Sequence, residues 1–113
     1  MGILRLSREP VKQEFVRNEA EKIASIIHRV LKPKSLFLFG SAARGEFTSQ
    51  SDFDFLLLYS SGEDLRKGQK LLRSIYPISE YPVELVWMLD DDFATKMKIG
   101  GLPFIVAQEG IQL

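Results

Sequence analysis

The hydrophobic positions of the chain follow two different periods. Between residues 12 and 32, apolar side chains recur at alternating spacings of four and three, which is the period of a helix with one buried face. This stripe consists of Val16, Ala20, Ile23, Ile27 and Val30. Pro33 is expected to end the helix, because proline disfavours helical backbone in the residue before it.

Three shorter apolar runs are predicted to form buried strands. Residues 35–39 (SLFLF) end at Gly40, residues 53–59 follow the polar loop 46–51, and VELVWM spans residues 83–88. Each run is short and is bounded by glycine, proline or polar residues, which is typical of strands in the interior of a sheet.

A helix is expected between the second and third strands. Ser60-Ser61 can cap its N-terminus, with Glu63 and Asp64 as capping-box partners, and the helix should end near Ile75. Its basic residues form either a solvated face or a patch that faces substrate. These residues are Arg66, Lys67, Lys70 and Arg73.

The rest of the chain is expected to be mostly helical. A helix from about Asp91, a break at Gly100-Gly101, a short helix from Pro103 and a final extended IQL complete it. The predicted fold class is α+β, a two-layer arrangement in which helices pack on a small mixed β-sheet. The length of 113 residues indicates a single domain, residues 1–113.

Two aspartates stand at the start of the second strand. Alternate side chains of a strand share a face, so Asp52 and Asp54 point the same way, about 7 Å apart along the backbone. The link between the first two strands, residues 41–51, is shorter than parallel crossovers usually are, so these strands are expected to be antiparallel. That arrangement brings the turn Gly40-Ser41 beside Asp52.

The third strand contains one charged residue, Glu84. The longer, helical connection before it favours a parallel crossover, which places the starts of the second and third strands at one end of the sheet. The carboxylates of Asp52, Asp54 and Glu84 are therefore expected to meet there. Each has a plainer explanation when taken singly, because aspartates cap turns and a lone glutamate in a strand usually faces solvent. Together, beside a glycine-serine turn, they favour a site.

Composition narrows what this site can bind. The chain has no cysteine and one histidine, so a metal must be held mainly by oxygen. Carboxylates in this number suit Mg²⁺ or Mn²⁺, whose charge keeps them ionised despite their mutual repulsion. Fifteen basic and fifteen acidic residues cancel, so no extended nucleic-acid surface and no membrane partner is indicated. A cytoplasmic location is expected, because no membrane span or signal-peptide core is present.

The motif around the aspartates resembles a known signature. Gly40-Ser41, ten intervening residues and Asp52-Phe53-Asp54 reproduce the G-S-x10-D-x-D pattern of the DNA polymerase β-like nucleotidyltransferase superfamily. The fuller GSAARG and SDFDFLLLY resemble its minimal nucleotidyltransferase (MNT) branch. Downstream, VELV resembles the strand with that family's third carboxylate, and AQEGIQL resembles its C-terminal end.

Other families with related motifs fit less well. In haloacid-dehalogenase-type phosphatases and many glycosyltransferases the D-x-D pair follows an apolar strand, whereas here the apolar run comes after Asp54. GSAARG is not a P-loop, because no Lys-Ser/Thr follows its glycine. The nucleotidyltransferase interpretation is therefore preferred.

The resemblance implies a nucleotidyltransferase fold and transfer of a nucleoside monophosphate, AMP from ATP or another NTP, with release of pyrophosphate. Asp52 and Asp54 would bridge two metal ions, and Glu84 would complete the ion nearest the acceptor and accept its proton. Gly40 and Ser41 would bind phosphate oxygens.

Two residues of the motif leave alternatives open. The third carboxylate is commonly aspartate in this branch, and the longer side chain of Glu84 favours metal binding over efficient catalysis. Arg44 either contacts phosphate or forms a salt bridge that fixes the turn, and the structural role is slightly favoured. His28 is expected at the surface or beside the core, and Trp87 in the core, neither with a catalytic role.

The resemblance also implies partners. MNT proteins are often paired with HEPN proteins as toxin–antitoxin partners, so a HEPN-type protein, or a second copy in a homo-oligomer, is expected to supply part of the acceptor site. The alternative is a catalytically weak nucleotide- and metal-binding antitoxin module that acts by binding its partner.

Overall fold

The apolar stripe near the N-terminus forms helix α1, Gln13–Val30, in the computed structural model, which describes residues 10–113. The stripe is buried at Val16, Ala20, Ile23 and Ile27 and partly buried at Val30. The predicted helix is confirmed, and it ends three residues before Pro33.

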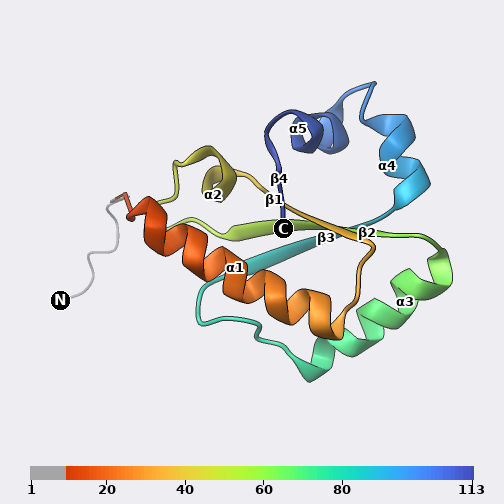
Figure 1. The fold of residues 1–113 in the computed structure, drawn as a ribbon, viewed down its shortest axis with the longest axis horizontal. Coiled ribbons are helices and arrows are strands. Elements are labelled where there is room, and N and C mark those ends of the chain that lie inside the picture. The colour runs from red at the N-terminus through yellow and green to blue at the C-terminus, as the bar shows by residue number, and fades with distance from the viewer. Residues whose placement is uncertain (1–9) are drawn as a thin grey trace.

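The three predicted strands and the final extended segment form one sheet (Figure 1). The strands are β1, Ser35–Phe39; β2, Phe53–Tyr59; β3, Val83–Leu89; and β4, Ile111–Gln112. Their order is β3-β2-β1-β4. As predicted, β1 and β2 are antiparallel and β2 and β3 are parallel, while β4 pairs antiparallel with β1.

The central strand β2 is buried on both faces, and this burial determines where the helices pack. On one face Phe53, Phe55 and Leu57 belong to a core that includes α1. On the other face Leu56 and Leu58 pack with residues of the C-terminal helices. Besides α1, the helices are α2, Ser41–Arg44; α3, Gly62–Leu71, continued by the 3-10 turn Leu72–Ser74; α4, Asp90–Lys96; and α5, Gly101–Glu109.

Helices α1 and α3 therefore cover one face of the sheet, and α4 and α5 cover the other (Figure 1). The mixed sheet with helices packed on it is confirmed, but the helices form a layer on each face instead of the single layer expected. The reason is the second apolar face of β2, which requires its own cover. Within the described residues, no helix is long and apolar enough to cross a membrane.

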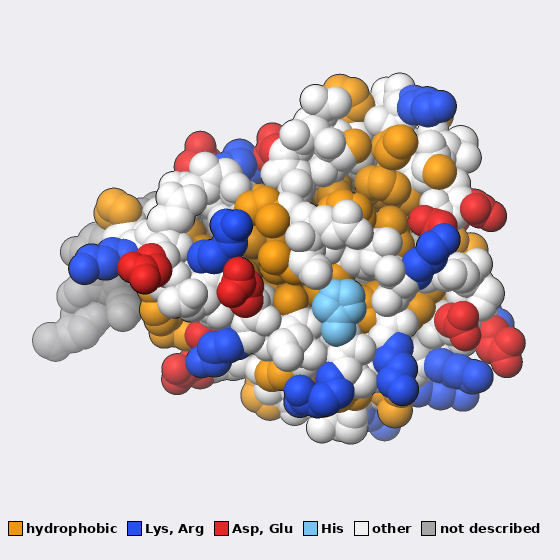
Figure 2. Space-filling view, in the orientation of Figure 1, with side chains coloured by type: hydrophobic (Ala, Val, Ile, Leu, Met, Phe, Trp, Pro, Cys, Tyr) orange, Lys and Arg blue, Asp and Glu red, His pale blue; other side chains and the backbone are white. Residues whose placement is uncertain are grey.

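The predicted N-cap of α3 is present. The Ser61 hydroxyl accepts a hydrogen bond from the backbone N–H of Asp64 at 3.1 Å, which satisfies one of the free donors at the start of the helix. Lys and Arg side chains gather at the lower right of Figure 2, over α3 and the C-terminal end of α1. The basic residues predicted for this helix are all exposed: Arg66, Lys67, Lys70 and Arg73.

Two aromatic residues test the predicted core. His28, pale blue in Figure 2, is exposed on α1, one of the two positions expected for it. Trp87 is only partly buried, so its expected place in the core is wrong in part. One face of its indole stacks on Tyr59 at 5.8 Å between ring centroids, and β3 is an edge strand of the sheet formed by the described residues.

Replacing Gly68 of α3 with alanine is expected to destabilise the fold, although alanine favours helix by about 1 kcal/mol. The added Cβ would lie 2.5 Å from the hydroxyl of Tyr59 and 3.2 Å from the carbonyl oxygen of Leu31. That hydroxyl donates a buried hydrogen bond of 2.8 Å to the same carbonyl. We expect a net loss of about 1–3 kcal/mol of unfolding free energy in urea titrations.

Gly62, in the same helix, provides the matched control. The atoms nearest to a Cβ there belong to the flexible guanidinium of Arg66, the closest at 3.1 Å. Gly62→Ala should therefore leave stability unchanged or raise it slightly. Equal destabilisation by the two substitutions would show that contact with Tyr59 is not the cause.

Candidate active site

Three carboxylates converge at one end of the sheet, as predicted from the sequence. Asp52 lies just before β2, Asp54 lies within it and Glu84 lies within β3. One carboxylate oxygen from each residue lies within 4.8 Å of the other two. Asp52 and Glu84 are exposed and Asp54 is partly buried, so the cluster opens to solvent.

The strand register explains this convergence. Asp54 is the direct partner of Glu84 in the parallel pair and of Phe39 in the antiparallel pair. Partners in register project from the same face of a sheet, so these side chains share the face that α4 and α5 cover farther along. The end of β1, with the turn that follows it, therefore meets the starts of β2 and β3.

Gly40 forms this turn, and two features require glycine there. Its φ of 75° and ψ of −156° lie in a region that side chains disfavour. A Cβ on Gly40 would also collide with Oδ2 of Asp54 and lie 3.3 Å from its Cγ. The absent side chain thus lets the Asp54 carboxylate lie against the backbone where α2 begins at Ser41. Gly45, with a φ of 79°, ends α2 in the left-handed conformation.

A protein-family profile described as "Nucleotidyltransferase domain" matches residues 20–112, most of the chain. The chain belongs to this family. No curated protein and no solved structure gives a significant match. The match includes both strands that carry the carboxylates, and it confirms the superfamily that the G-S-x10-D-x-D motif indicated.

The nucleotidyltransferase domain holds Asp54 in an environment that disfavours its charge. Burial, a hydrogen bond with Glu84 and the negative charges of Glu84 and Asp52 raise the pKa of Asp54 from 3.8 to about 6. The positive charge of Arg44 acts in the opposite direction. In the absence of a cation, this carboxylate is therefore partly protonated near neutral pH.

This shifted pKa predicts how the metal-free domain responds to pH. Asp54 has a higher pKa in the folded state than in the unfolded state, so its protonation favours folding. This contribution to stability is fully present below about pH 4 and is lost as the pH rises through about 6. In thermal melts with EDTA, the original protein should therefore lose stability relative to Asp54→Asn as the pH rises from 4 to 7. The melting temperature of the variant minus that of the original should increase over this range. A difference that stays flat across this range would contradict the raised pKa.

The donor set fits a divalent cation. Mg²⁺ holds oxygen ligands at about 2.1 Å, which places neighbouring ligands of one ion about 3–4 Å apart. The carboxylate oxygens, all within 4.8 Å of one another, lie close to that spacing. The charge of a cation also removes the cause of the raised pKa of Asp54, because it favours the ionised carboxylate.

Arg44 forms salt bridges, as one of its two predicted roles requires. Its Nε lies 3.0 Å from Oε1 of Glu46, and its Nη1 lies 3.2 Å from Oε1 of Glu109. The hydrogen bonds to Glu46 and Glu109 raise the pKa of Arg44. These pairs connect the end of α2 to the end of α5. They support the structural role, and the effect of Arg44 on the pKa of Asp54 leaves a phosphate contact as a proposal.

Sequence reasoning did not find Glu46 or Glu109 as partners of Arg44. Glu46 follows only two residues after the arginine, so local spacing gave a usable signal. Glu109 lies 65 residues away, and only the return of the chain from α5 into β4, which pairs with β1, brings it close.

Proposed function

We propose that this domain transfers a nucleoside monophosphate, AMP from ATP, to an acceptor and releases pyrophosphate. The observation that carries the proposal is the cluster of Asp52, Asp54 and Glu84 beside the Gly40 turn, in a chain that belongs to the nucleotidyltransferase family. The chemistry needs little covalent participation by the protein, because charge stabilisation and positioning account for most of phosphoryl transfer.

The carboxylates have distinct roles in this proposal. Asp52 and Asp54 share a face at the start of β2 and together bind two Mg²⁺ ions, with Mn²⁺ as a substitute. Bound cations of this kind stabilise the attacking and leaving oxygens of an in-line displacement. Glu84 enters from the neighbouring strand, completes the site on the acceptor side and accepts the acceptor's proton.

The turn forms the phosphate side of the site. Gly40 lets a triphosphate approach the backbone beside Asp54, and Ser41 offers its hydroxyl at the start of α2. Arg44 adds positive charge at the other end of the same short helix while it remains paired with Glu46 and Glu109.

We propose a protein acceptor, as in the MNT branch that the motif resembles. Asp52 and Glu84 are exposed, Asp54 is partly buried, and the chain has a single small domain around them, so the acceptor's own surface completes the site. A HEPN-type toxin is the proposed partner, and a second copy of the chain is the alternative source of that surface.

A second function, neutralisation by binding alone, is favoured by one observation. Glu84 carries a longer side chain than the aspartate of the resembled branch, and this length moves its carboxylate away from the strand. A domain of this kind would bind nucleotide, metal and partner but transfer slowly.

Label transfer separates these functions. With Mg²⁺ and ATP labelled at the α-phosphate, an enzyme transfers label to a HEPN-type partner. ATP labelled at the γ-phosphate is the matched control, because that phosphate leaves with pyrophosphate. Transfer of α-label alone supports the proposal, and transfer of γ-label would indicate a kinase. Neutralisation of the partner with no transfer from either nucleotide would overturn the enzymatic proposal in favour of the binding module.

A further inference from the structure

Exposed cations gather on α3 and the end of α1 (Figure 2). We call this group the basic surface, and its members are Arg29, Lys32, Arg66, Lys67, Lys70 and Arg73. Among the described residues, none of these cations takes part in an ion pair closer than 4.0 Å, whereas Lys22, Lys34 and Arg44 each pair with a carboxylate. The basic and acidic residues of the chain cancel in total, but they are not evenly distributed on its surface.

The parts of the basic surface on α1 and on α3 are continuous. A Cβ on Gly68 would lie 3.2 Å from the carbonyl oxygen of Leu31, so the end of α1 packs directly against α3. Lys32 from α1 and Lys67 from α3 line one hollow between the two helices, together with Asp64. Cations from both helices therefore face the same space.

A second hollow, of about 570 Å³, lies along α3. Its lining consists of Arg66, Gln69, Lys70 and Arg73, so every side chain there can donate a hydrogen bond and none is a carboxylate. From the first of these cations to the last, the helix extends about 10 Å. That length spans about three nucleotides of a stacked strand, in which phosphates follow one another every ~3.4 Å. The hollow therefore suits a short run of phosphates.

Carboxylates limit the basic surface at the N-terminal end of α3. Glu63 and Asp64 lie in the first turn of this helix. The first turn of α4 is acidic as well, but α4 covers the opposite face of the sheet. The positive part of α3 therefore begins at Arg66 and continues to the end of the helix, where the chain leads to Tyr76.

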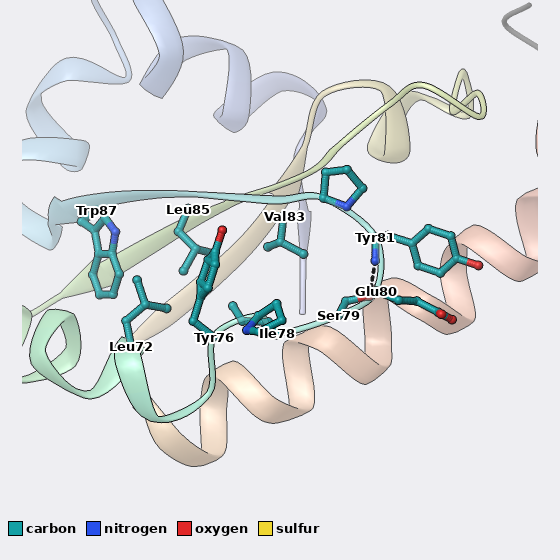
Figure 3. Close-up of a pocket in the computed structure, with 11 residues that line it drawn as sticks. Leu72, Tyr76, Ile78, Ser79, Glu80, Tyr81, Val83, Leu85 and Trp87 are labelled. Carbon is teal, nitrogen blue, oxygen red and sulfur yellow. Dashed lines mark hydrogen bonds between the residues drawn. The ribbon is translucent and has the colours of Figure 1, made fainter. Parts of the chain in front are cut away.

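An aromatic cavity of about 420 Å³ lies where α3 ends. Figure 3 shows Leu85 and Trp87 projecting from β3 toward the segment of residues 72–82, and Tyr76 projecting from that segment toward the strand. Tyr76 is 68% exposed, and its ring pairs with no other aromatic ring of the described residues. Pockets of about 300–1,000 Å³ bind small organic molecules, so the cavity has room for a nucleobase.

The aromatic cavity adjoins the basic surface. Leu72 lines the cavity, and Arg73, the next residue, lines the cationic hollow. Proteins that bind single-stranded nucleic acid combine these two elements, because cations follow the phosphates while bases stack on aromatic rings. A duplex fits less well, since its bases stack on one another. An acidic protein also fits less well, because protein interfaces are poor in lysine and half of these cations are lysines.

We propose that the basic surface and the aromatic cavity bind a single-stranded nucleic acid, RNA or DNA, through its phosphates and one base. Arg66, Lys70 and Arg73 contact successive phosphates, and the base of the nucleotide beyond them stacks on Tyr76. These contacts read no sequence, since every nucleotide has a phosphate and a ring face.

This binding is independent of the carboxylate triad. Asp54 and Glu84 project from the face of the sheet that α4 and α5 cover, whereas α3 packs on the other face. Binding therefore requires neither Mg²⁺ nor a nucleoside triphosphate, and it is measured in EDTA without either. Asp52→Asn with Asp54→Asn should bind the strand as the original does, and weaker binding would place the strand at the triad and overturn the proposal.

Substitution of the cations tests the phosphate contacts. Fluorescence anisotropy is measured with labelled oligouridine RNA and oligothymidine DNA of about 12 nucleotides, at about 50 mM salt. Arg66→Gln with Lys70→Gln and Arg73→Gln should raise Kd at least about tenfold. The slope of log Kd against log salt concentration should fall by about 2, because each phosphate contact of a single strand contributes about 0.7. The oligonucleotide bound more tightly identifies the nucleic acid that the surface takes.

A matched control removes the same charge elsewhere. Lys12, Lys96 and Lys98 are exposed and form no ion pair closer than 4.0 Å among the described residues. Lys12→Gln with Lys96→Gln and Lys98→Gln should retain both the affinity and the salt slope. Equal losses in the two triple variants would show that only net charge matters and would overturn the proposal.

Substitution of Tyr76 tests the stacked base. Tyr76→Ala should raise Kd by about 5–150-fold, the range for one lost base stack, with the salt slope unchanged. Tyr76→Phe keeps the ring and should keep the affinity. No binding of either oligonucleotide, or duplex binding as tight as single-strand binding with Tyr76→Ala unchanged, overturns the proposal. Tighter binding of a polyglutamate peptide also overturns it and assigns the basic surface to an acidic protein.

Discussion

Replacing Asp52 and Asp54 together with asparagine is expected to abolish Mg²⁺-dependent nucleotidyl transfer while the metal-free protein stays folded. Each of these residues contributes a carboxylate oxygen to the cluster, in which the oxygens lie within 4.8 Å of one another. Altering groups that only support metal ligands costs about 10–100-fold in affinity or activity, so loss of two ligands should exceed that range. Label transfer and Mg²⁺ titration measure the two losses.

The same double substitution should not lower the stability of the metal-free protein. Neighbouring negative charge and burial disfavour the ionised Asp54, as its raised pKa indicates. Asparagine retains similar size and hydrogen-bonding capacity but removes the charge, so the melting temperature in EDTA should stay equal or rise. Mg²⁺ should raise the melting temperature of the original protein and leave that of the double variant unchanged.

A charge-matched control separates local from general effects. Asp91 and Asp92 are exposed in the first turn of α4, away from the triad. Asp91→Asn with Asp92→Asn removes the same formal charge and should retain both transfer and the response to Mg²⁺. If the Asp52 and Asp54 variant instead melts far below the original in EDTA, these aspartates serve as structural caps and the assignment of a metal site is wrong.

Gly40→Ala is expected to weaken Mg²⁺ binding, because the new side chain would displace the Asp54 carboxylate although Gly40 is not itself a ligand. The new Cβ would occupy the space of the Asp54 carboxylate, and the backbone at φ 75° and ψ −156° disfavours any side chain. Strain of this kind costs about 1–3 kcal/mol. The affinity for Mg²⁺ should fall at least about tenfold, since Asp54 or the turn must move. Isothermal titration and urea denaturation measure the two effects.

Gly45→Ala tests whether backbone strain alone explains that loss. Gly45 also has positive φ, at 79°, but a Cβ there would meet the flexible side-chain amide of Gln13, at 3.1 Å, and no carboxylate of the site. We expect a stability loss of about 1 kcal/mol with Mg²⁺ affinity retained. Equal loss of affinity in both variants would show that the turn as a whole, and not the approach of Gly40 to Asp54, controls the site.

Local patterns were sufficient to predict most of the fold. The periods of apolar residues gave α1 and the strands β1, β2 and β3, and connection lengths gave their relative directions. The carboxylate cluster followed from these directions, because Glu84 lies where a parallel third strand begins. The spacing of apolar residues and the lengths of the connections are local properties of the chain, so they can be read from one sequence.

Other features depend on contacts that local patterns do not encode. Whether helices cover one face of β2 or both depends on where α4 and α5, which lie on either side of the Gly100-Gly101 break, pack against the sheet. The partial exposure of Trp87 depends on β3 being an edge strand of the sheet. The pairing of Arg44 with Glu109 requires the whole C-terminal segment to return to β1.

The parallel pairing of β2 with β3 has a consequence for local opening of the fold. The β1–β2 hairpin already contains two carboxylates, but the third arrives only when the crossover through α3 has closed. If β3 separates from β2, the cluster loses Glu84 while the hairpin remains. A cation bound at the proposed site would therefore stabilise the crossover, because by mass action it would disfavour every form in which β3 has left the sheet.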